Sequence, residues 1–176
     1  MAVYLDHNAT TPLHEDVLQA MLPLMQKSVG NPSSLHRYGR LQKDAIEWAR
    51  EQVALLVDAH PQQVVFTSGG TEANNLALKG ITAAADINRI AVSKIEHTSI
   101  LEPAAELGDG CTVDYIAVDN EGRITATLLQ QAMKAETRLV SVMSANNETG
   151  VIQDIPLLAP ICLLYTSDAA DDSALV

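Results

Sequence analysis

A short turn of small residues, Ser-Gly-Gly-Thr at positions 68–71, has the composition of a phosphate-binding site. A helix-competent segment, residues 72–84, follows it. Unpaired backbone N–H groups and the positive end of the helix dipole bind anions at such a helix start. Gly69 and Gly70 let the backbone approach a ligand closely, and the two hydroxyl groups of the turn add donors. The turn therefore predicts a phosphate site, with an ordinary strand-to-helix turn capped by Ser or Thr as the alternative.

Two further polar clusters could take part in the same chemistry. His97 carries an imidazole, which exchanges protons in the physiological pH range and has a flat ring suited to stacking. Asn146 and Asn147 can donate hydrogen bonds to a ligand oxygen, and Glu148 beside them can orient a neighbour. Each has a structural alternative, because a histidine can cap the helix after it, asparagine is common in turns, and an acidic side chain is usually solvated.

Apolar segments alternate with helical patterns from residue 64 onward, which is typical of βαβ units. The pattern predicts an α/β fold with a mostly parallel sheet flanked by helices. Ligands of such sheets bind beyond the carboxyl ends of the strands. The three polar clusters follow the first, second and fourth predicted strands, so we expect them to form one site. The expected strands are residues 64–67, 89–93, 112–118 and 139–145, and the expected helices are residues 72–84, 99–107 and 125–135 and one that starts at Pro156.

The amino-terminal part of the chain is predicted to be extended and then helical. Residues 1–12 form the extended segment, and Pro12 suits the first turn of a helix that reaches about residue 27. A long helix that ends near Ala59 follows a loop at residues 30–34. No linker composition follows, so residues 13–161 are expected to form one partial domain.

Charge and composition argue against several classes of partner. The formal net charge is −11, which disfavours nucleic acid and anionic membranes. No apolar run approaches the roughly 20 residues that span a bilayer. The two cysteines, Cys111 and Cys162, form neither a disulfide framework nor a metal-binding pattern. We therefore expect a cytoplasmic protein without a metal site, and a core that is aliphatic because only 3% of the residues are aromatic.

Five motifs along the chain resemble those of the cysteine desulfurases, which are pyridoxal-phosphate enzymes of the aminotransferase class V type. They are Tyr-Leu-Asp-His-Asn-Ala-Thr-Thr-Pro at 4–12, Gly-Asn-Pro-Ser-Ser-Leu-His at 30–36, Phe-Thr-Ser-Gly-Gly-Thr-Glu at 66–72, Glu-His at 96–97 and Asn-Asn-Glu-Thr-Gly at 146–150. The resemblance covers about residues 3–161 and looks like the branch that serves iron–sulfur cluster assembly and nitrogenase maturation.

The resemblance implies the large domain of a fold-type I transferase and assigns roles to four residues. Gly70 and Thr71 would hold the phosphate of pyridoxal 5'-phosphate, His97 would stack on its ring and shuttle protons, and Asn147 would bond its phenolic oxygen. The substrate would be L-cysteine, converted to L-alanine with a persulfide left on the enzyme for a sulfur-acceptor or scaffold protein. The full-length parent would be a cytoplasmic homodimer.

The family places other necessary groups later in its chain. These are the cofactor-binding lysine, the acidic partner of the pyridine nitrogen, the persulfide cysteine and an arginine for the substrate carboxylate. Lys79, Lys94 and both cysteines fall outside those motifs, so we expect this chain to be an inactive amino-terminal fragment. The alternatives are a selenocysteine lyase or another class V enzyme, and a non-enzymatic phosphate-binding α/β module.

Residues 162–176 differ in character from the rest and are expected to be a foreign tail. They begin Cys-Leu-Leu-Tyr-Thr-Ser-Asp-Ala-Ala-Asp, which resembles a translated transposon-end adapter from a DNA sequencing library. We predict that resequencing the source DNA across codon 162 gives a different continuation. A continuous natural reading frame that encodes this segment would contradict the prediction and support a genuine acidic tail.

Overall fold

The computed structural model describes residues 3–5, 7, 9–27, 29–85 and 87–165. The contacts within the chain divide it into two compact units, Met1–Phe66 and Thr67–Val176. This division falls inside the segment 13–161 that the sequence predicts to be one domain. The boundaries expected from the sequence, at 1–12, 13–161 and 162–176, stay a prediction.

The first unit is helical. Its elements are α1 (Glu15–Lys27), α2 (Arg37–Leu56) and a short 3-10 helix, η1 (Pro61–Gln63). Both long helices were expected from the sequence, but α2 ends before Ala59. The reason is Asp58, whose φ of 53° lies in the left-handed region and ends the helix, while the Ala59 N–H bonds the carbonyl of Ala54 at 2.9 Å.

The loop before α2 leaves no room for side chains at two glycines. Gly30 has a φ of +147°, and a Cβ there would lie under 3.0 Å from the backbone of Tyr38. A Cβ on Gly39 would lie even closer to the carbonyl oxygens of Asn31 and Ser34. The start of α2 therefore packs directly against the backbone of its own loop.

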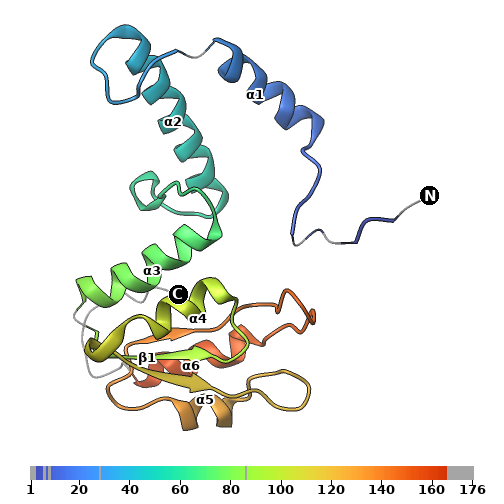
Figure 1. The fold of residues 1–176 in the computed structure, drawn as a ribbon, viewed down its shortest axis with the longest axis vertical. Coiled ribbons are helices and arrows are strands. Elements are labelled where there is room, and N and C mark those ends of the chain that lie inside the picture. The colour runs from blue at the N-terminus through green and yellow to red at the C-terminus, as the bar shows by residue number, and fades with distance from the viewer. Residues whose placement is uncertain (1–2, 6, 8, 28, 86, 166–176) are drawn as a thin grey trace. The chain divides into compact units, whose positions relative to one another are not determined.

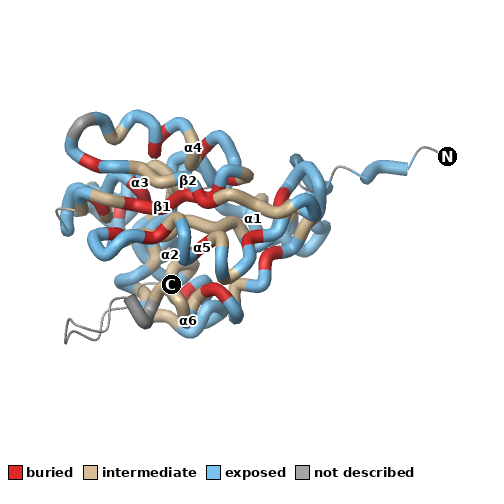
Figure 2. The backbone as a smooth tube through the Cα atoms, turned by 90° about the horizontal axis from the view of Figure 1, so that it is seen from below, coloured by how far each residue is buried: buried red, intermediate tan, exposed pale blue. Residues whose placement is uncertain are grey.

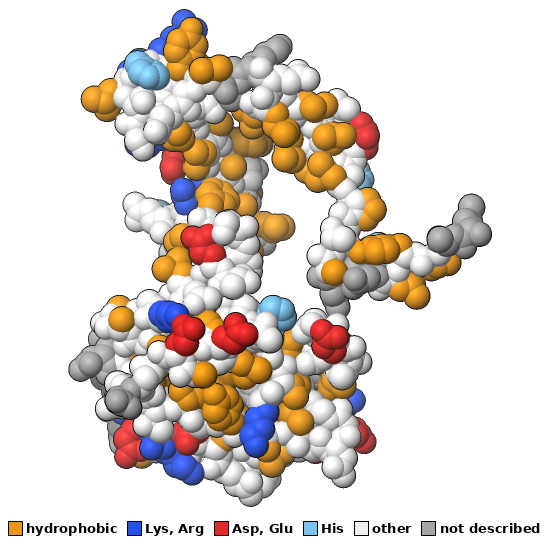
Figure 3. Space-filling view, viewed as in Figure 1, with side chains coloured by type: hydrophobic (Ala, Val, Ile, Leu, Met, Phe, Trp, Pro, Cys, Tyr) orange, Lys and Arg blue, Asp and Glu red, His pale blue; other side chains and the backbone are white. Residues whose placement is uncertain are grey.

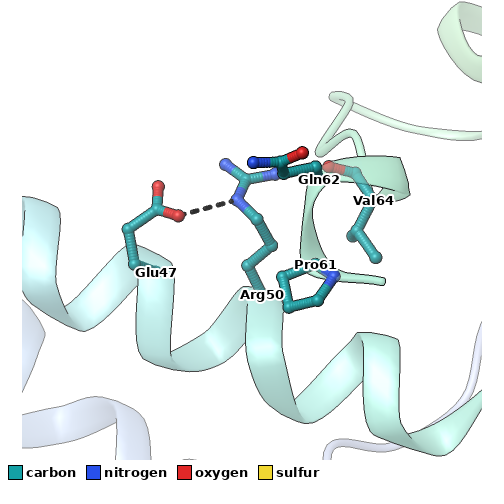
Figure 4. A pocket seen from close by; sticks show the side chains of 5 residues that line it. All are labelled: Glu47, Arg50, Pro61, Gln62 and Val64. Atoms are coloured by element: carbon teal, nitrogen blue, oxygen red, sulfur yellow. Dashed lines mark hydrogen bonds and ion pairs between the residues drawn. The ribbon is translucent and has the colours of Figure 1, made fainter. Parts of the chain in front are cut away.

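Residues 64–66 pack against α2, and the prediction of a strand at residues 64–67 is wrong. Val64 has extended dihedrals, φ −90° and ψ 124°, but no strand pairs with it among the described residues. Instead, the Arg50 side chain donates a hydrogen bond to the Val64 carbonyl, and its guanidinium lies 4.9 Å from the centre of the Phe66 ring. Figure 4 shows Arg50 between Glu47 and this segment, beside a small cavity. Arg50 thus donates to the carbonyl group that would otherwise accept a hydrogen bond from a neighbouring strand.

Much of the apolar surface of α1 and α2 is exposed, as Figure 3 shows. No helix within the described residues is long and apolar enough to cross a membrane. The large exposed side chains include Met21, Leu24, Met25, Leu41, Trp48, Leu55 and Leu56.

The second unit is a parallel sheet with helices on both faces, as the sequence predicts. Its strands lie in the order β2-β1-β3, and both pairings are parallel. Figure 1 shows α4 and α5 on opposite sides of β1. The elements are α3 (Gly70–Ala84), β1 (Arg89–Ser93), α4 (Thr98–Ala105), η2 (Gly108–Gly110), β2 (Thr112–Ile116), α5 (Ala126–Ala132), β3 (Leu139–Ser141) and α6 (Ile155–Tyr165).

Alternate residues of β1 supply the cores of the two faces. Ile90 and Val92 pack in a cluster with Leu78 of α3 and Ala104 of α4. Ala91 belongs to the other cluster, whose members on α5 and α6 include Leu129 and Leu158. All three β1 residues are fully buried, and Figure 2 shows this strand within the buried part of the unit.

Two sheet strands are shorter than predicted. β2 stops at Ile116, and β3 stops at Ser141 instead of continuing to Ala145. Ala145 pairs with Ile152 in an isolated antiparallel bridge, because the chain reverses there through the polar loop between them. The expected foreign tail begins inside α6, where Cys162 is half-buried against the core, and residues 166–176 lie outside the described part of the chain.

We predict that Gly39→Ala lowers the free energy of unfolding by about 2 kcal/mol or more, because the added methyl group meets backbone oxygens that cannot move aside. Thermal unfolding followed by circular dichroism measures the change. Gly80→Ala is the matched control: it lies in α3, its Cβ would meet only Leu76 Cδ1 at 3.9 Å, and it should be neutral or stabilise by up to about 1 kcal/mol. Equal stability of the two variants would contradict the packing described here.

Candidate functional site

The turn at residues 68–71 starts α3 with open donors. Gly69 is the N-cap and makes no side-chain cap, so the predicted alternative of a Ser or Thr cap is wrong. The first bond within the helix runs from the Ala73 N–H to the Gly69 carbonyl at 3.1 Å, so the N–H groups of Gly70, Thr71 and Glu72 precede the helical ladder. A Cβ on Gly69 or Gly70 would meet nothing within 4 Å. The helix start thus has both donors and space for an anion.

Ser68 does not add a donor to this space. Its N–H and its hydroxyl both donate to Glu72 Oε2, each at 2.6 Å. These two hydrogen bonds lower the pKa of the Glu72 carboxyl. The expectation that the Ser68 hydroxyl donates to a ligand is therefore wrong, because the hydroxyl donates its hydrogen bond to Glu72.

His97 follows β1 and caps α4. Its Nδ1 accepts the Ser99 N–H at 3.1 Å, and the Ser99 hydroxyl oxygen lies 2.8 Å from the same nitrogen. The structural alternative, a capping histidine, is thus confirmed. The residue is nevertheless exposed, so capping fixes the position of the ring without burying it.

A side chain of α3 connects the phosphate turn to His97. Asn74 Nδ2 donates to the Ser99 hydroxyl oxygen at 2.8 Å. Asn74 is three and four residues after Thr71 and Gly70, which places it beside them on the same face of the helix. The sequence analysis missed this role of Asn74, although its position one helical turn after the glycines was a signal that could have revealed it.

The two asparagines after β3 have different roles. Asn146 is buried, donates from Nδ2 to the Ile95 carbonyl at 3.0 Å, and accepts the Glu148 and Thr149 N–H groups at 3.0 and 2.9 Å. It therefore holds the loop, as the turn alternative predicts. Asn147 is exposed and donates to Glu148 Oε1 at 3.0 Å, so Glu148 does orient a neighbour.

These contacts bring the three clusters to one end of the sheet. Asn74 and Ser99 connect the start of α3 to His97, and Asn146 anchors its loop to Ile95, two residues before His97. The turn at residues 119–123 stays a surface turn, in which Asp119 Oδ1 accepts two backbone N–H groups at 2.9 Å. The three clusters converge as expected, but only His97 and the Asn146 loop follow strands of the described sheet, because residues 64–67 form no strand.

Glu96 belongs to the Glu-His motif at 96–97 and is a buried carboxylate, a property that the sequence did not indicate. Its Oε1 has no hydrogen-bond partner among the described residues. Burial raises the pKa of the Glu96 carboxyl, and the opposing effects of the Met143 N–H, the Ser141 hydroxyl and His97 are smaller. The sequence gave no sign that Glu96 is buried, because this burial arises only when β1 packs against β3.

The sequence profile of one protein family, described as aminotransferase class-V, matches residues 3–170. The chain belongs to the aminotransferase class-V family. Within it, the chain is 44% identical over 166 residues to the cysteine desulfurase IscS of Dictyoglomus turgidum, which covers 93% of this chain and 42% of that protein. It is 45% identical over 156 residues to a putative cysteine desulfurase, IscS 1, of Bacillus subtilis, covering 87% of this chain and 41% of the relative.

Solved structures of the same kind superpose closely on this class-V chain. A protein described as NifS-like matches with a TM-score of 0.88 and 35% identity, over 95% of this chain and 47% of the other. The structure titled SspA in complex with cysteine matches with a TM-score of 0.84 and 32% identity, over 93% and 48%. The chain therefore spans less than half the length of these relatives and solved structures.

We predict that Glu96→Gln stabilises the protein at neutral pH by about 1 kcal/mol, because it removes a poorly solvated charge. A raised pKa means that the protonated carboxyl suits the folded state. The stability that the protonated Glu96 carboxyl contributes is fully present below the ordinary pKa of 4.5. It is lost as the pH rises through the raised pKa of the folded state. The gain of the variant should therefore disappear in acid.

Chemical denaturation at neutral pH and below the ordinary carboxyl pKa measures this difference. Glu136→Gln, at an exposed position, is the control and should change stability little at either pH. A stability gain for Glu96→Gln that does not depend on pH would contradict the role of the buried charge.

Proposed function

We propose that this chain is the amino-terminal part of a pyridoxal-phosphate-dependent cysteine desulfurase. The proposed full-length enzyme converts L-cysteine to L-alanine and keeps the sulfur as an enzyme-bound persulfide. The observation that carries the proposal is the set of hydrogen bonds that connects the start of α3, His97 and the Asn146 loop at one end of a parallel sheet. The relatives named cysteine desulfurase support it.

The residues at the start of α3 fit a phosphate group. The backbone N–H groups of Gly70 and Thr71 lie before the helical ladder, and the positions next to Gly69 and Gly70 are open. The helix dipole favours an anion at this end. In the proposal, Gly70 and Thr71 hold the phosphate of the cofactor through these N–H groups and the Thr71 hydroxyl.

His97 and Asn147 supply the remaining contacts that this chain can make. The capping bond to Ser99 holds the His97 ring at the end of β1, where its flat face can stack on an aromatic ring. The Asn147 amide can donate to the phenolic oxygen, and Glu148 orients it. The cofactor, when bound, supplies the electron sink for chemistry at the substrate α-carbon. The protein residues bind and orient it.

Other features of the proposed enzyme follow from the family resemblance. The sulfur would pass to an acceptor or scaffold protein for iron–sulfur cluster assembly, and the full-length protein would act as a cytoplasmic homodimer. The solved relative in complex with cysteine supports L-cysteine as the substrate. The present chain matches under half of each relative, so we expect it to be inactive alone.

The test is to recover the coding sequence that continues residue 161, express the longer protein, and measure alanine release from L-cysteine with added pyridoxal phosphate. We expect release by the longer protein and none above background by the 176-residue chain. Release by the short chain, or a continuation that encodes no candidate cofactor lysine, would contradict the proposal.

In the longer protein, Thr71→Ala should weaken cofactor binding about tenfold, because one hydrogen bond to a charged phosphate contributes roughly 1.5 kcal/mol. The Kd follows from the change in cofactor absorbance on titration. Thr127→Ala is the matched control, since Thr127 is also an exposed threonine near a helix start, but on α5. If both variants bind equally, Thr71 does not hold the phosphate.

A further inference from the structure

Three hydrogen bonds around Ser99 have a direction that the chemistry of the donors determines. The Ser99 backbone N–H meets His97 Nδ1 at 3.1 Å. A backbone N–H can only donate, so Nδ1 must offer its lone pair and cannot carry a proton. The ring proton of neutral His97 therefore lies on Nε2.

The Ser99 hydroxyl must point the same way. Its oxygen lies 2.8 Å from an Nδ1 that has no proton, so the hydroxyl is the donor in this contact. The oxygen then has lone pairs free for a donor from elsewhere. Asn74 supplies one, since its amide nitrogen lies 2.8 Å from the hydroxyl oxygen.

We infer that Asn74 and Ser99 are positioning residues that hold the neutral His97 ring as the tautomer with its proton on Nε2. Asn74 donates to Ser99, and Ser99 donates to His97, so α3 controls the orientation of the hydroxyl proton. Nδ1 is occupied by two donors from Ser99. Nε2 is then the ring nitrogen left for a ligand, and it meets that ligand as a hydrogen-bond donor.

The reverse arrangement is less favourable for a structural reason. If Nδ1 carried a proton, that N–H would donate to the Ser99 oxygen, and the Ser99 hydroxyl proton would need another acceptor. The Ser99 N–H would then lose its acceptor at the start of α4. Losing a helix cap destabilises the start of the helix, and Ser99 is buried, so solvent does not replace the cap easily.

The inference deepens the proposed function and rests on it for one consequence only. If the His97 ring, beside its proposed stacking, makes a hydrogen bond to the cofactor or substrate, it does so as a donor through Nε2 and not as a base at that nitrogen. The arrangement of protons itself needs no cofactor and can be measured in the 176-residue chain.

The test is nuclear magnetic resonance of the chain with ¹⁵N-labelled histidine at neutral pH, with the His97 signals assigned by their loss in His97→Gln. Long-range ¹H–¹⁵N correlations show which ring nitrogen carries the proton. We expect protonated Nε2, unprotonated Nδ1, and a protected Ser99 hydroxyl proton that correlates with Nδ1. A proton on Nδ1 in the unsubstituted chain overturns the inference without any variant.

Asn74→Asp tests the control by α3. The substitution keeps the shape but replaces the donor with a carboxylate, which only accepts. The Ser99 hydroxyl should turn away from His97, so its correlation with Nδ1 should be lost, and the Nδ1 signal should shift toward that of a free unprotonated nitrogen. Ser99→Ala should give the same shift, and Ser99→Thr should restore the original signal.

Controls are available in the same chain. Asn75→Asp changes the neighbouring amide, which donates to the Thr71 carbonyl at 2.9 Å, and should leave the His97 signals unchanged. His36 Nδ1 also accepts a backbone N–H, from Gly39 at 3.2 Å, and its signal should stay constant in every variant. An unchanged His97 signal in both Asn74→Asp and Ser99→Ala overturns the inference.

The two proposals can fail separately. If the longer protein releases no alanine but the proton arrangement is found, the proposed function fails and this inference stands. If alanine is released but Nδ1 is protonated in the 176-residue chain, the proposed function stands and this inference fails.

Discussion

The burial of β1 on both faces is the constraint on which the site depends. Ile90 and Val92 pack under α3 and α4, while Ala91 packs toward α5 and α6. β2 and β3 pair with the two edges of β1 in parallel register. A strand enclosed on four sides cannot slip or turn over without losing every one of these contacts. The residues that leave its carboxyl end, Glu96 and His97, therefore have a determined position against α3 and the loop after β3.

Much of the second unit could be predicted from the sequence, because its signals are local. The strand at Arg89–Ser93 matches its predicted bounds, and parallel pairing follows from single helices between the strands. The convergence of His97 and the Asn146 loop follows from the same rule, because they come after β1 and β3. The capping role of His97 was also open to prediction, because it requires only that a helix starts at the next residue.

The remaining features depend on contacts between distant residues. The segment at residues 64–67 has strand-forming side chains, yet Arg50 occupies its carbonyl and no strand is beside it in the described structure. The sequence suggests that the Ser68 hydroxyl donates to a ligand, but in the structure it donates to Glu72. Asn146 and Asn147 are equivalent in sequence, and only the depth of the loop separates a buried anchor from an exposed donor. Composition and periodicity do not predict such specific hydrogen bonds between side chains and their partners.

A glycine can be required for folding or for ligand binding, and the open space beside Gly69 and Gly70 distinguishes these two requirements. Among the described residues, no atom lies within 4 Å of a methyl group placed at either position, whereas the backbone itself opposes one at Gly39. A mutational scan scored by cellular abundance would therefore tolerate alanine at the α3 turn, and one scored by activity of the proposed enzyme would reject it. Under the proposed function, variants at these glycines would accumulate as well-folded protein with weakened cofactor binding, a defect that excess vitamin B6 in the medium would partly relieve.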